Sequence, residues 1–534
     1  MKIKKFLALV LTSVILVACS NNDADDNGGI VKNPQGKAWL SLSIKNPSGT
    51  QLRSLNNPDK ETGTSAETDV KSVRAIFFDG SKNVTDDIVL TSLEAGNPGS
   101  PTGAAGEGFE VAATAENVMI IVNPPSGLGT FSVGDSYTTV NTALTLSVAS
   151  VTDAATDGFM MTNAKGDLEP STPTGGLAAL TLYATKAQAE AAPLSINVDR
   201  VVAKVRLYTA AHTVPAGITV SNIEWVLNIT NKKFFPLSER KKTFLNTATS
   251  FDQYGLGSFR QDPNYDHSAD GAVYPNPGYT TSYNYYTEAA PPAPGDWLLP
   301  TDGGGTAQYC HENTQIQADN NFAYVTHMIV RAEYLPNNFM KVDSTLVGPE
   351  TSKDWMRISG RIYNFTSLMT YIKKELDDKY AAADPTTVAT PRSNALNNYL
   401  DSVGLVGSKV PIPPTGNAAT ATTVYTAFSG LQSTIEGNTN KAGTFGSFAY
   451  YAGGINYYRI AIKHDDTGSA TNELGEFGVV RNSVYDVTIR SINNPGLPAI
   501  PEPDPQDPIE ADGSYISVEI NINPWTWYTQ IEDL

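Results

Sequence analysis

A short alternating segment near the N-terminus, at residues 37–53, reads KAWLSLSIKNPSGTQLR. Leu40, Leu42 and Ile44 alternate with the residues between them, which is the period-two pattern of a half-buried β-strand. The segment then passes through a turn-forming Asn-Pro-Ser-Gly run to Arg53, the only arginine among the first 73 residues. The sequence therefore predicts a strand followed at once by a residue that trypsin-like proteases prefer.

The first 18 residues have the features of an export signal. Three lysines precede an apolar run that ends at Ala18, and this run is too short to span a bilayer. Cys19 completes the sequence LVAC, which resembles a bacterial lipobox, in which the cysteine is acylated. We therefore expect lipid, including palmitate, on Cys19 to hold the protein on a membrane. The alternative is an ordinary signal peptide with an incidental cysteine.

Size, charge and cysteine content limit the classes of protein that the chain can belong to. Its 534 residues and 40% apolar composition suffice for several domains with buried cores. The formal net charge of −18 repels nucleic acid, so we expect no nucleic-acid partner. Cys19 and Cys310 are the only cysteines, so a lipidated Cys19 leaves no intrachain disulfide.

Past residue 60 the chain consists mostly of short β-type runs separated by turn residues, and it contains 43 Gly and 33 Pro in total. Frequent turn residues between short strands favour antiparallel β-sandwiches over alternating βαβ units. A second block of strands begins near residue 210. The clearest strand candidates of the first block are residues 73–80, 116–125, 177–184 and 193–210.

A helical patch interrupts the second block near 367–404. Apolar residues recur every four positions behind Ser367, a candidate N-cap, and a second short helix is expected at 394–403. Farther along, a proline-rich connector at 493–513 leads to a last alternating strand. The apolar positions of that strand are Ile516, Val518, Ile520 and Ile522.

No group of residues indicates catalysis. Cys310, His311 and Glu312 are adjacent, but neighbouring residues of a strand point to opposite faces, so the thiol and the imidazole do not readily pair. The histidines show no metal-ligand spacing, and no nucleotide-binding or nucleophile-elbow motif stands in the required context. We therefore expect no enzyme activity, no metal and no cofactor. The tyrosine-rich residues 280–300 leave glycan binding as an alternative function.

Several segments resemble recurrent segments of the Bacteroidales fimbrillin family, the lipoprotein-derived type V pilins. The resemblance runs from residue 1 almost to residue 534, and residues 270–300 and the helical insertion match no recurrent segment. In chain order the matching segments are DVKSVRAIFFD (69–79), VDRVVAKVRL (198–207), YCHENT (309–314), HMIVRAEYLP (327–336), GGINYYRIAIKH (453–464), GVVRNSVYDVTIRSINNPGLP (478–498) and ISVEININPW (516–525).

The resemblance implies a mainly β fold of two tandem transthyretin-like antiparallel β-sandwich domains, with a short helical insertion in the second. It also implies no enzyme activity. The expected N-terminal divisions are a lipoprotein signal peptide at 1–18 and a lipidated propeptide with a provisional strand at 19–53. Two β-sandwiches are expected to follow, the N-terminal one at 54–209 and the C-terminal one at 210–513, with the insertion near 367–404. The last division is a C-terminal strand or tail at 514–534.

The family resemblance further implies a mechanism. The precursor is an outer-membrane lipoprotein that a protease with arginine specificity cleaves between Arg53 and Ser54. The strand of Leu40, Leu42 and Ile44 then leaves a groove, and the C-terminal strand of a neighbouring subunit fills it. The expected donor residues are Ile516, Val518, Ile520 and Ile522.

Some alternatives stay open at the level of sequence. Residues 38–45 can instead be a permanent edge strand, with Arg53 incidental. Residues 514–523 can be the last strand of their own sandwich, with only the tail beyond Pro524 donated.

The expected partners are copies of this chain and other fimbrial subunits in a head-to-tail cell-surface polymer, the processing protease, and host or bacterial surface ligands in adhesion and biofilm. A surface glycan-binding lipoprotein or a fimbrial tip adhesin is the alternative function.

Overall fold

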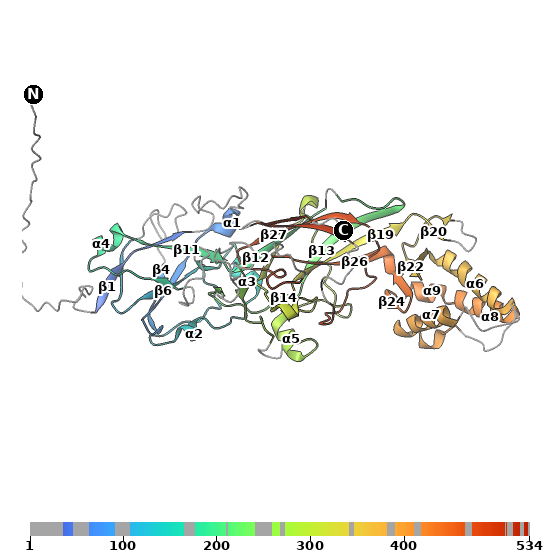
Figure 1. Ribbon diagram of the computed structural model, residues 1–534, viewed down its shortest axis with the longest axis horizontal. Helices are drawn as coiled ribbons and strands as arrows, with labels where there is room; N and C mark the ends of the chain where they lie inside the picture. Colours follow the sequence, from blue (N-terminus) through green and yellow to red (C-terminus); the bar gives the residue numbers. More distant parts are fainter. Residues whose placement is uncertain are drawn as a thin grey trace, which may run out of the picture.

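The protein is elongated, as the computed structural model in Figure 1 shows. Three large hydrophobic clusters follow one another along its long axis: a first β region, a second β region in the middle and a helical region at the far end. The structure describes residues 36–45, 63–90, 107–164, 177–209, 212–240, 259–267, 273–340, 346–381, 390–410, 418–464, 472–507, 509, 516–523 and 528–531.

The first β region is built around two strands with almost continuous apolar runs. β3 (Val73–Phe78) and β6 (Asn117–Val122) are neighbours inside a seven-stranded sheet, and their apolar side chains are buried. Such runs are typical of strands that are covered on both faces. The sheet order is β2 (Leu42–Lys45), β11 (Leu194–Arg200), β9 (Met161–Ala164), β6, β3 and β4 (Val84–Leu90), while β10 (Ala178–Ala179) pairs with β6, and β1 (Lys37–Leu40) pairs with β5 (Phe109–Ala112).

The second β region is a sandwich whose two sheets share one hydrophobic cluster. Val205, Trp225 and Tyr485 come from different strands of the two sheets and all lie in this cluster. One sheet has the order β18 (Gln308–His311), β12 (Val202–Tyr208), β27 (Val484–Ile492), β28 (Ile516–Asn523) and β29 (Tyr528–Ile531), and the other has the order β13 (Ile218–Asn228), β19 (His327–Pro336) and β26 (Ile455–Ala461).

The boundary between the two β regions lies earlier than the sequence indicated. The expected first domain ended at residue 209, but β12 pairs with β18 and β27. Of its apolar side chains, Val202 still lies in the first cluster, while Ala203, Val205 and Leu207 lie in the second. The chain passes from one sheet to the other at Val201, between β11 and β12. The polar pair Asp199 and Arg200, which interrupts the alternation just before the crossing, is the local sign of it in the sequence. The mainly β fold is confirmed, and the transthyretin-like tandem arrangement stays a prediction.

The helical region is larger than expected and has its own core. Ser367 is not the N-cap of the first helix: that helix begins at Phe365, and the Ser367 N–H donates to Asn364 Oδ1 (2.8 Å), so Asn364 caps it. The helices are α6 (Phe365–Ala381), α7 (Thr390–Ser402), α8 (Ala418–Ser429) and α9 (Gln432–Glu436), and they pack beside a sheet of β23 (Arg361–Tyr363), β22 (Trp355–Ile358), β25 (Phe448–Tyr451) and β24 (Gly443–Phe445).

The remaining elements are short and connect or flank the sheets. The helices are α1 (Ser65–Thr68), α2 (Tyr137–Val140), α3 (Val148–Val151), α4 (Lys186–Ala191) and α5 (Pro277–Ser282). The strands pair as β7 (Thr152–Asp153) with β8 (Gly158–Phe159), β14 (Thr230–Asn231) with β17 (Tyr283–Asn284), β15 (Glu239–Arg240) with β16 (Arg260–Gln261), and β20 (Phe339–Met340) with β21 (Leu346–Val347).

A buried carboxylate joins the two β regions. Glu67 of α1 is 1% exposed, its carboxylate lies 2.9 Å from Lys204 Nζ on β12, and it accepts a hydrogen bond from the Tyr309 hydroxyl on β18 (2.6 Å). The Thr64 N–H also donates to it (2.6 Å), which completes a capping box. Burial alone would raise the pKa of Glu67, but the hydrogen bonds from Tyr309, Thr64 and Lys204 hold this pKa below its usual value.

Removing the charge of Glu67 is expected to destabilise the folded protein. Glu67→Gln leaves Lys204 buried without its anionic partner, which typically costs about 3–5 kcal/mol of the free energy of unfolding. Because the folded-state pKa lies below the unfolded value of about 4.5, this stabilisation is complete above pH 4.5 and is lost as the pH falls through the folded-state pKa. Denaturant unfolding from neutral to acidic pH measures the difference between wild type and variant, which we expect to shrink at acidic pH.

Glu107→Gln is the matched control, because Glu107 forms an ion pair with Lys186 at the surface, where water and salt screen the interaction. This control should leave the free energy of unfolding unchanged at neutral pH. Equal losses for the two variants, or a difference that grows at acidic pH, would contradict the role assigned to Glu67.

Candidate assembly site at the two terminal strands

β1 and β2 form one extended segment that changes its pairing partner at Ser41. β1 runs antiparallel to β5, with Leu40 opposite Phe109. β2 then runs parallel to β11, with Ile44 opposite Ile196. Within the described part of the chain β2 pairs with no other strand, so it forms an edge of the seven-stranded sheet.

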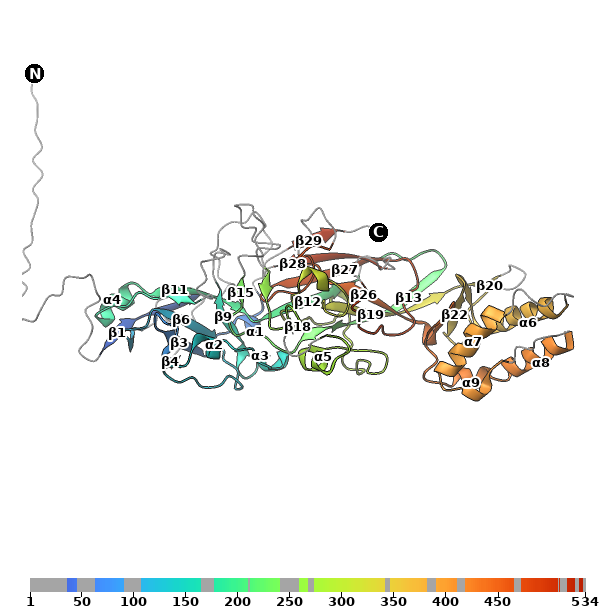
Figure 2. The same cartoon turned by 60° about the horizontal axis from the view of Figure 1, so that its bottom comes forward.

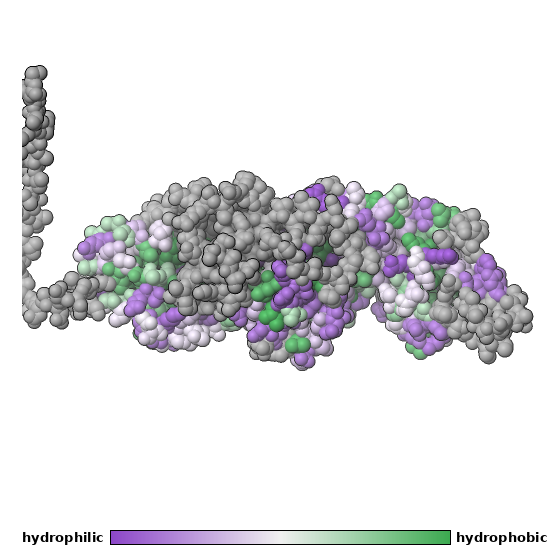
Figure 3. All heavy atoms as spheres, in the orientation of Figure 1, coloured by the Kyte–Doolittle hydropathy of each residue, from purple (hydrophilic) through white to green (hydrophobic). Residues whose placement is uncertain are grey.

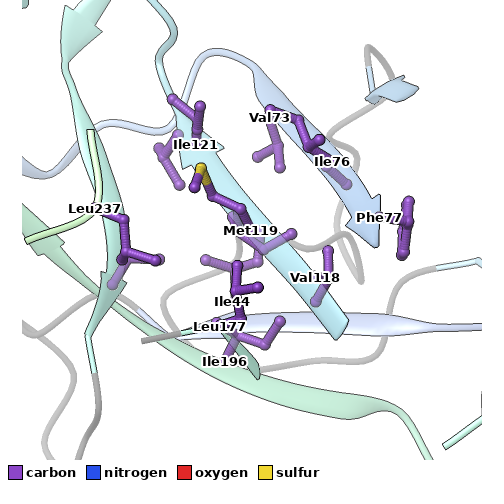
Figure 4. Close-up of a cluster of buried hydrophobic side chains, with 14 of the residues drawn as sticks. Ile44, Val73, Ile76, Phe77, Val118, Met119, Ile121, Leu177, Ile196 and Leu237 are labelled. Carbon is purple, nitrogen blue, oxygen red and sulfur yellow. The ribbon is translucent and has the colours of Figure 1, made fainter. Parts of the chain in front are cut away.

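The side chains expected to face inward lie in the first hydrophobic cluster. Leu40, Leu42 and Ile44 are 1%, 0% and 2% exposed, and Figure 4 shows Ile44 within this group of buried side chains. The expectation of a half-buried strand is wrong for the opposite face, because Ser41 and Ser43 are buried as well. The segment is therefore inserted into the first β region and does not lie on its surface.

Backbone and charge contacts also hold the segment. Trp39 and Tyr183 exchange two backbone hydrogen bonds of 2.8 and 2.9 Å, and the Leu194 N–H donates to the Ser41 carbonyl (2.8 Å). At the start of β1, Lys37 Nζ lies 3.1 Å from Asp86 Oδ1. The segment is thus fixed from both sides of the point where its partner changes.

The strength of this attachment can be compared with that of a free peptide. Burying the three aliphatic side chains contributes about 1.5–3 kcal/mol each, or about 5–9 kcal/mol together. For a separate peptide, free energies of this size correspond to dissociation constants between about millimolar and micromolar. While the segment is part of the chain, its high effective concentration keeps it bound. Its retention therefore depends on the covalent connection.

The C-terminal strands form an antiparallel hairpin at the edge of the second sheet. β28 pairs with β27, with Ile516 opposite Ile492 and Asn523 opposite Val484. β29 pairs with β28 on its other side. Figure 2 shows β27, β28 and β29 in this order. The expected strand that carries Ile516, Val518, Ile520 and Ile522 is present, and here it lies in the sheet of its own domain.

Sequence reasoning missed two features of these strands. The change of partner within the first segment had no local signal, because Ser41 and Ser43 belong to the same alternation. β29 had none either, because Tyr528–Ile531 do not alternate between apolar and polar residues. The expected lipidation and cleavage residues Cys19, Arg53 and Ser54 lie outside the described residues.

The adjacent Cys310 and His311 lie in different surroundings. Cys310 is fully buried in the second cluster, and burial raises the pKa of its thiol to about 12. His311 stacks on Phe234 with 4.5 Å between ring centroids, and burial lowers its pKa to about 4. A protonated thiol and an imidazole that does not contact it lack the thiolate character that a cysteine nucleophile needs.

The described residues contain neither a metal-ligand cluster nor a membrane-spanning helix. No group of three or more His, Cys, Asp and Glu side chains there could hold a metal ion. In the same part of the chain, no helix combines the length and apolar character needed to cross a membrane.

Two family models match the chain. Residues 38–198 match the model "Major fimbrial subunit protein (FimA)". Residues 449–531 match the model "Major fimbrial subunit protein type IV, Fimbrillin, C-terminal". The first match begins within β1 and the second ends with β29, so the matches include both terminal strands.

A search of curated proteins found no match. Among solved structures, the chain is similar to a fimbrilin from Porphyromonas gingivalis at 11% identity and a TM-score of 0.37, covering 93% of this chain and 99% of that one. It is similar to the C-terminally truncated tip fimbrial protein Mfa3 from the same organism at 10% identity and a TM-score of 0.34, covering 92% and 100%.

A third similar structure is a candidate cell adhesion protein from Parabacteroides distasonis, with 15% identity, a TM-score of 0.38, and 92% and 99% of the two chains covered. The two family matches lie in the N-terminal and C-terminal parts of the chain and contain the strands described above. Two parts of the chain, residues 38–198 and 449–531, therefore match the family of major fimbrial subunit proteins, the fimbrillins.

Proposed function

We propose that the protein is a structural subunit of a cell-surface fimbria that is cleaved after Arg53 and polymerises by donor-strand exchange. The observation that carries this proposal is the edge strand β2, which is buried and yet pairs with a single strand, β11. An edge strand that fills a core can be replaced by another strand of similar pattern without rearranging the rest of the sheet.

Cleavage is the step that makes the replacement possible. Once the chain is cut after Arg53, the segment that contains β1 and β2 becomes a separate peptide and loses its effective concentration when it diffuses away. Its departure exposes the Leu40, Leu42 and Ile44 pockets of the first cluster and the free edges of β5 and β11. An open sheet edge beside an apolar groove is a site for strand addition.

The β28–β29 hairpin is the proposed donor. Among the described residues β28 pairs only with β27 and β29, so the hairpin can leave the second sheet by breaking one strand pair. Its alternating Ile516, Val518, Ile520 and Ile522 offer a row of aliphatic side chains like that of the departing segment. Donation from each subunit to the next is head-to-tail and does not close on itself, so the product is a filament.

The proposed route to the cell surface starts from a lipoprotein. Acylation of Cys19 anchors the precursor to the outer membrane, and cleavage after Arg53 separates the mature subunit from this anchor. The partners are further copies of the chain, other fimbrial subunits and a protease with arginine specificity. The assembled fimbria then acts in adhesion and biofilm formation.

Replacing Arg53 should block processing and polymerisation together. Limited treatment of the purified precursor with an arginine-specific protease is expected to give a new N-terminus at Ser54 and ladders of polymer that resist detergent. Arg53→Ala should stay monomeric under the same treatment, because the tethered segment continues to fill its groove. N-terminal sequencing and gel electrophoresis measure the two outcomes.

Lys60→Ala is the matched control, since it removes a positive charge close to Arg53 in sequence and leaves the arginine that the protease cuts. This variant should be cut at Ser54 and polymerise like the wild type. Polymers formed by uncut Arg53→Ala, or cleaved wild type that remains monomeric, would refute the proposed activation.

Charged substitutions at neighbouring positions of β28 test whether this strand, and not the tail beyond Pro524, is the donor. A charge at Ile520 is expected to abolish polymer growth, because Ile520→Asp places a carboxylate in an apolar groove. Asn521→Asp adds the same charge at the neighbouring position, which the strand directs to the other face, and should polymerise normally. Electron microscopy of the cleaved variants measures polymer length, and circular dichroism checks that each monomer is folded.

A deletion of residues 524–534 completes this test. If the deletion stops polymerisation while Ile520→Asp polymerises normally, the tail beyond Pro524 is the donor and the assignment of β28 is wrong. Normal filaments from both Ile520→Asp and the deletion would contradict donation by any part of the hairpin.

A further inference from the structure

A cleft of about 610 Å³ lies where the first β region meets the second, and neither terminal strand lines it. One wall is the segment 145–148 that leads into α3, and the opposite wall contains β14, β17 and the tyrosines that follow β17. Figures 1 and 2 both place α3 beside α5. Figure 3 shows apolar and hydrophilic residues side by side over this part of the molecule.

Contacts between the two regions hold the walls in place. Leu144 and Phe234 exchange backbone hydrogen bonds of 2.8 and 3.0 Å across the junction. His311 Nε2 lies 2.9 Å from the Leu146 carbonyl, and the Leu237 N–H donates to Asn141 Oδ1 (2.7 Å). The cleft is therefore formed before any ligand arrives, and a ligand does not have to order its walls.

The aromatic wall consists of tyrosine rings that pack against, or hydrogen-bond to, further buried side chains. Tyr283 is 1% exposed, and its hydroxyl lies 3.0 Å from His267 Nδ1. Tyr279 is buried as well, and its ring centroid lies 5.0 Å from that of Tyr285. Tyr285 and Tyr286 remain half-buried at the cleft. Rigid aromatic rings with polar ends suit a ligand that has apolar faces and hydroxyl groups.

Neutral polar groups complete the lining. Gln308 Oε1 accepts from the Leu227 N–H (2.9 Å), so its amide NH₂ is the group left to donate. His311 Nε2 donates to the Leu146 carbonyl and its Nδ1 is buried, so this ring serves as part of the wall. Asn284 adds an exposed amide. Such a set of donors and acceptors matches hydroxyl groups, which both donate and accept.

The charges of the cleft exclude two classes of ligand. Among the described residues its lining contains no Asp or Glu, although the chain has 55 acidic and 37 basic residues, so a cationic ligand finds no carboxylate there. Lys232 is the one charged side chain in this described lining, and its Nζ already donates to the Thr280 carbonyl (2.7 Å). The net charge of −18 repels anions. We propose that the cleft binds a short neutral oligosaccharide.

Blocking the cleft tests this proposal on the uncut chain, so the result does not depend on polymerisation. Wild-type protein is expected to bind at least one glycan of a panel of neutral and uronate-containing oligosaccharides, measured by array and by saturation-transfer NMR. Thr145→Arg fills the cleft from an exposed position, and Asn284→Ala removes an exposed amide. Each should weaken binding of the neutral glycan at least about tenfold.

Thr142→Arg is the matched control, because Thr142 is exposed three residues before Thr145 but does not line the cleft. It should bind like the wild type, and all variants should unfold at the temperature of the wild type. The proposal is overturned if no neutral glycan binds, or if binding survives Thr145→Arg. Binding of uronate-containing glycans alone, lost in Lys232→Gln, would overturn the assignment to neutral sugars.

Discussion

The segment of residues 37–45 constrains the rest of the structure, because it completes a core from the edge of a sheet. β2 has one pairing partner, but its Leu42 and Ile44 are as deeply buried as the central strands of that sheet. An edge strand is where a sheet can add a further strand, and here the edge is occupied by a segment whose covalent connection adds to its burial and hydrogen bonds. In the proposed mechanism, a single cut downstream would leave the first domain without this strand.

The junction between the two β regions bears on whether the subunit can lose that segment, as we propose, and remain whole. Glu67 follows the expected cleavage site and is held by Lys204 and Tyr309, which belong to the second region. Breaking the pair of Glu67 and Lys204 would leave an uncompensated buried charge, so we expect the two regions to stay joined during the proposed exchange.

Local patterns predicted the strands well and predicted their partners poorly. Alternation was enough to place Leu40, Leu42 and Ile44 in a core and to identify β28, because period-two spacing is a property of the strand alone. The change of sheet at Val201 was missed because residues 193–210 have the composition of one continuous β-type run, although Asp199 and Arg200 interrupt its alternation. The contact between Glu67 and Tyr309 joins residues 242 positions apart, and no local pattern encodes such a pairing.

Locking the first segment in place tests the central claim most directly. Ser43 lies opposite Ser195 in the β2–β11 pair, so Ser43→Cys with Ser195→Cys allows a disulfide across it, while the native Cys310 is fully buried. After cleavage at Arg53, the oxidised variant should remain monomeric and should polymerise when reductant is added. Filaments that form while this disulfide is intact would show that the segment does not have to leave, and would contradict the account.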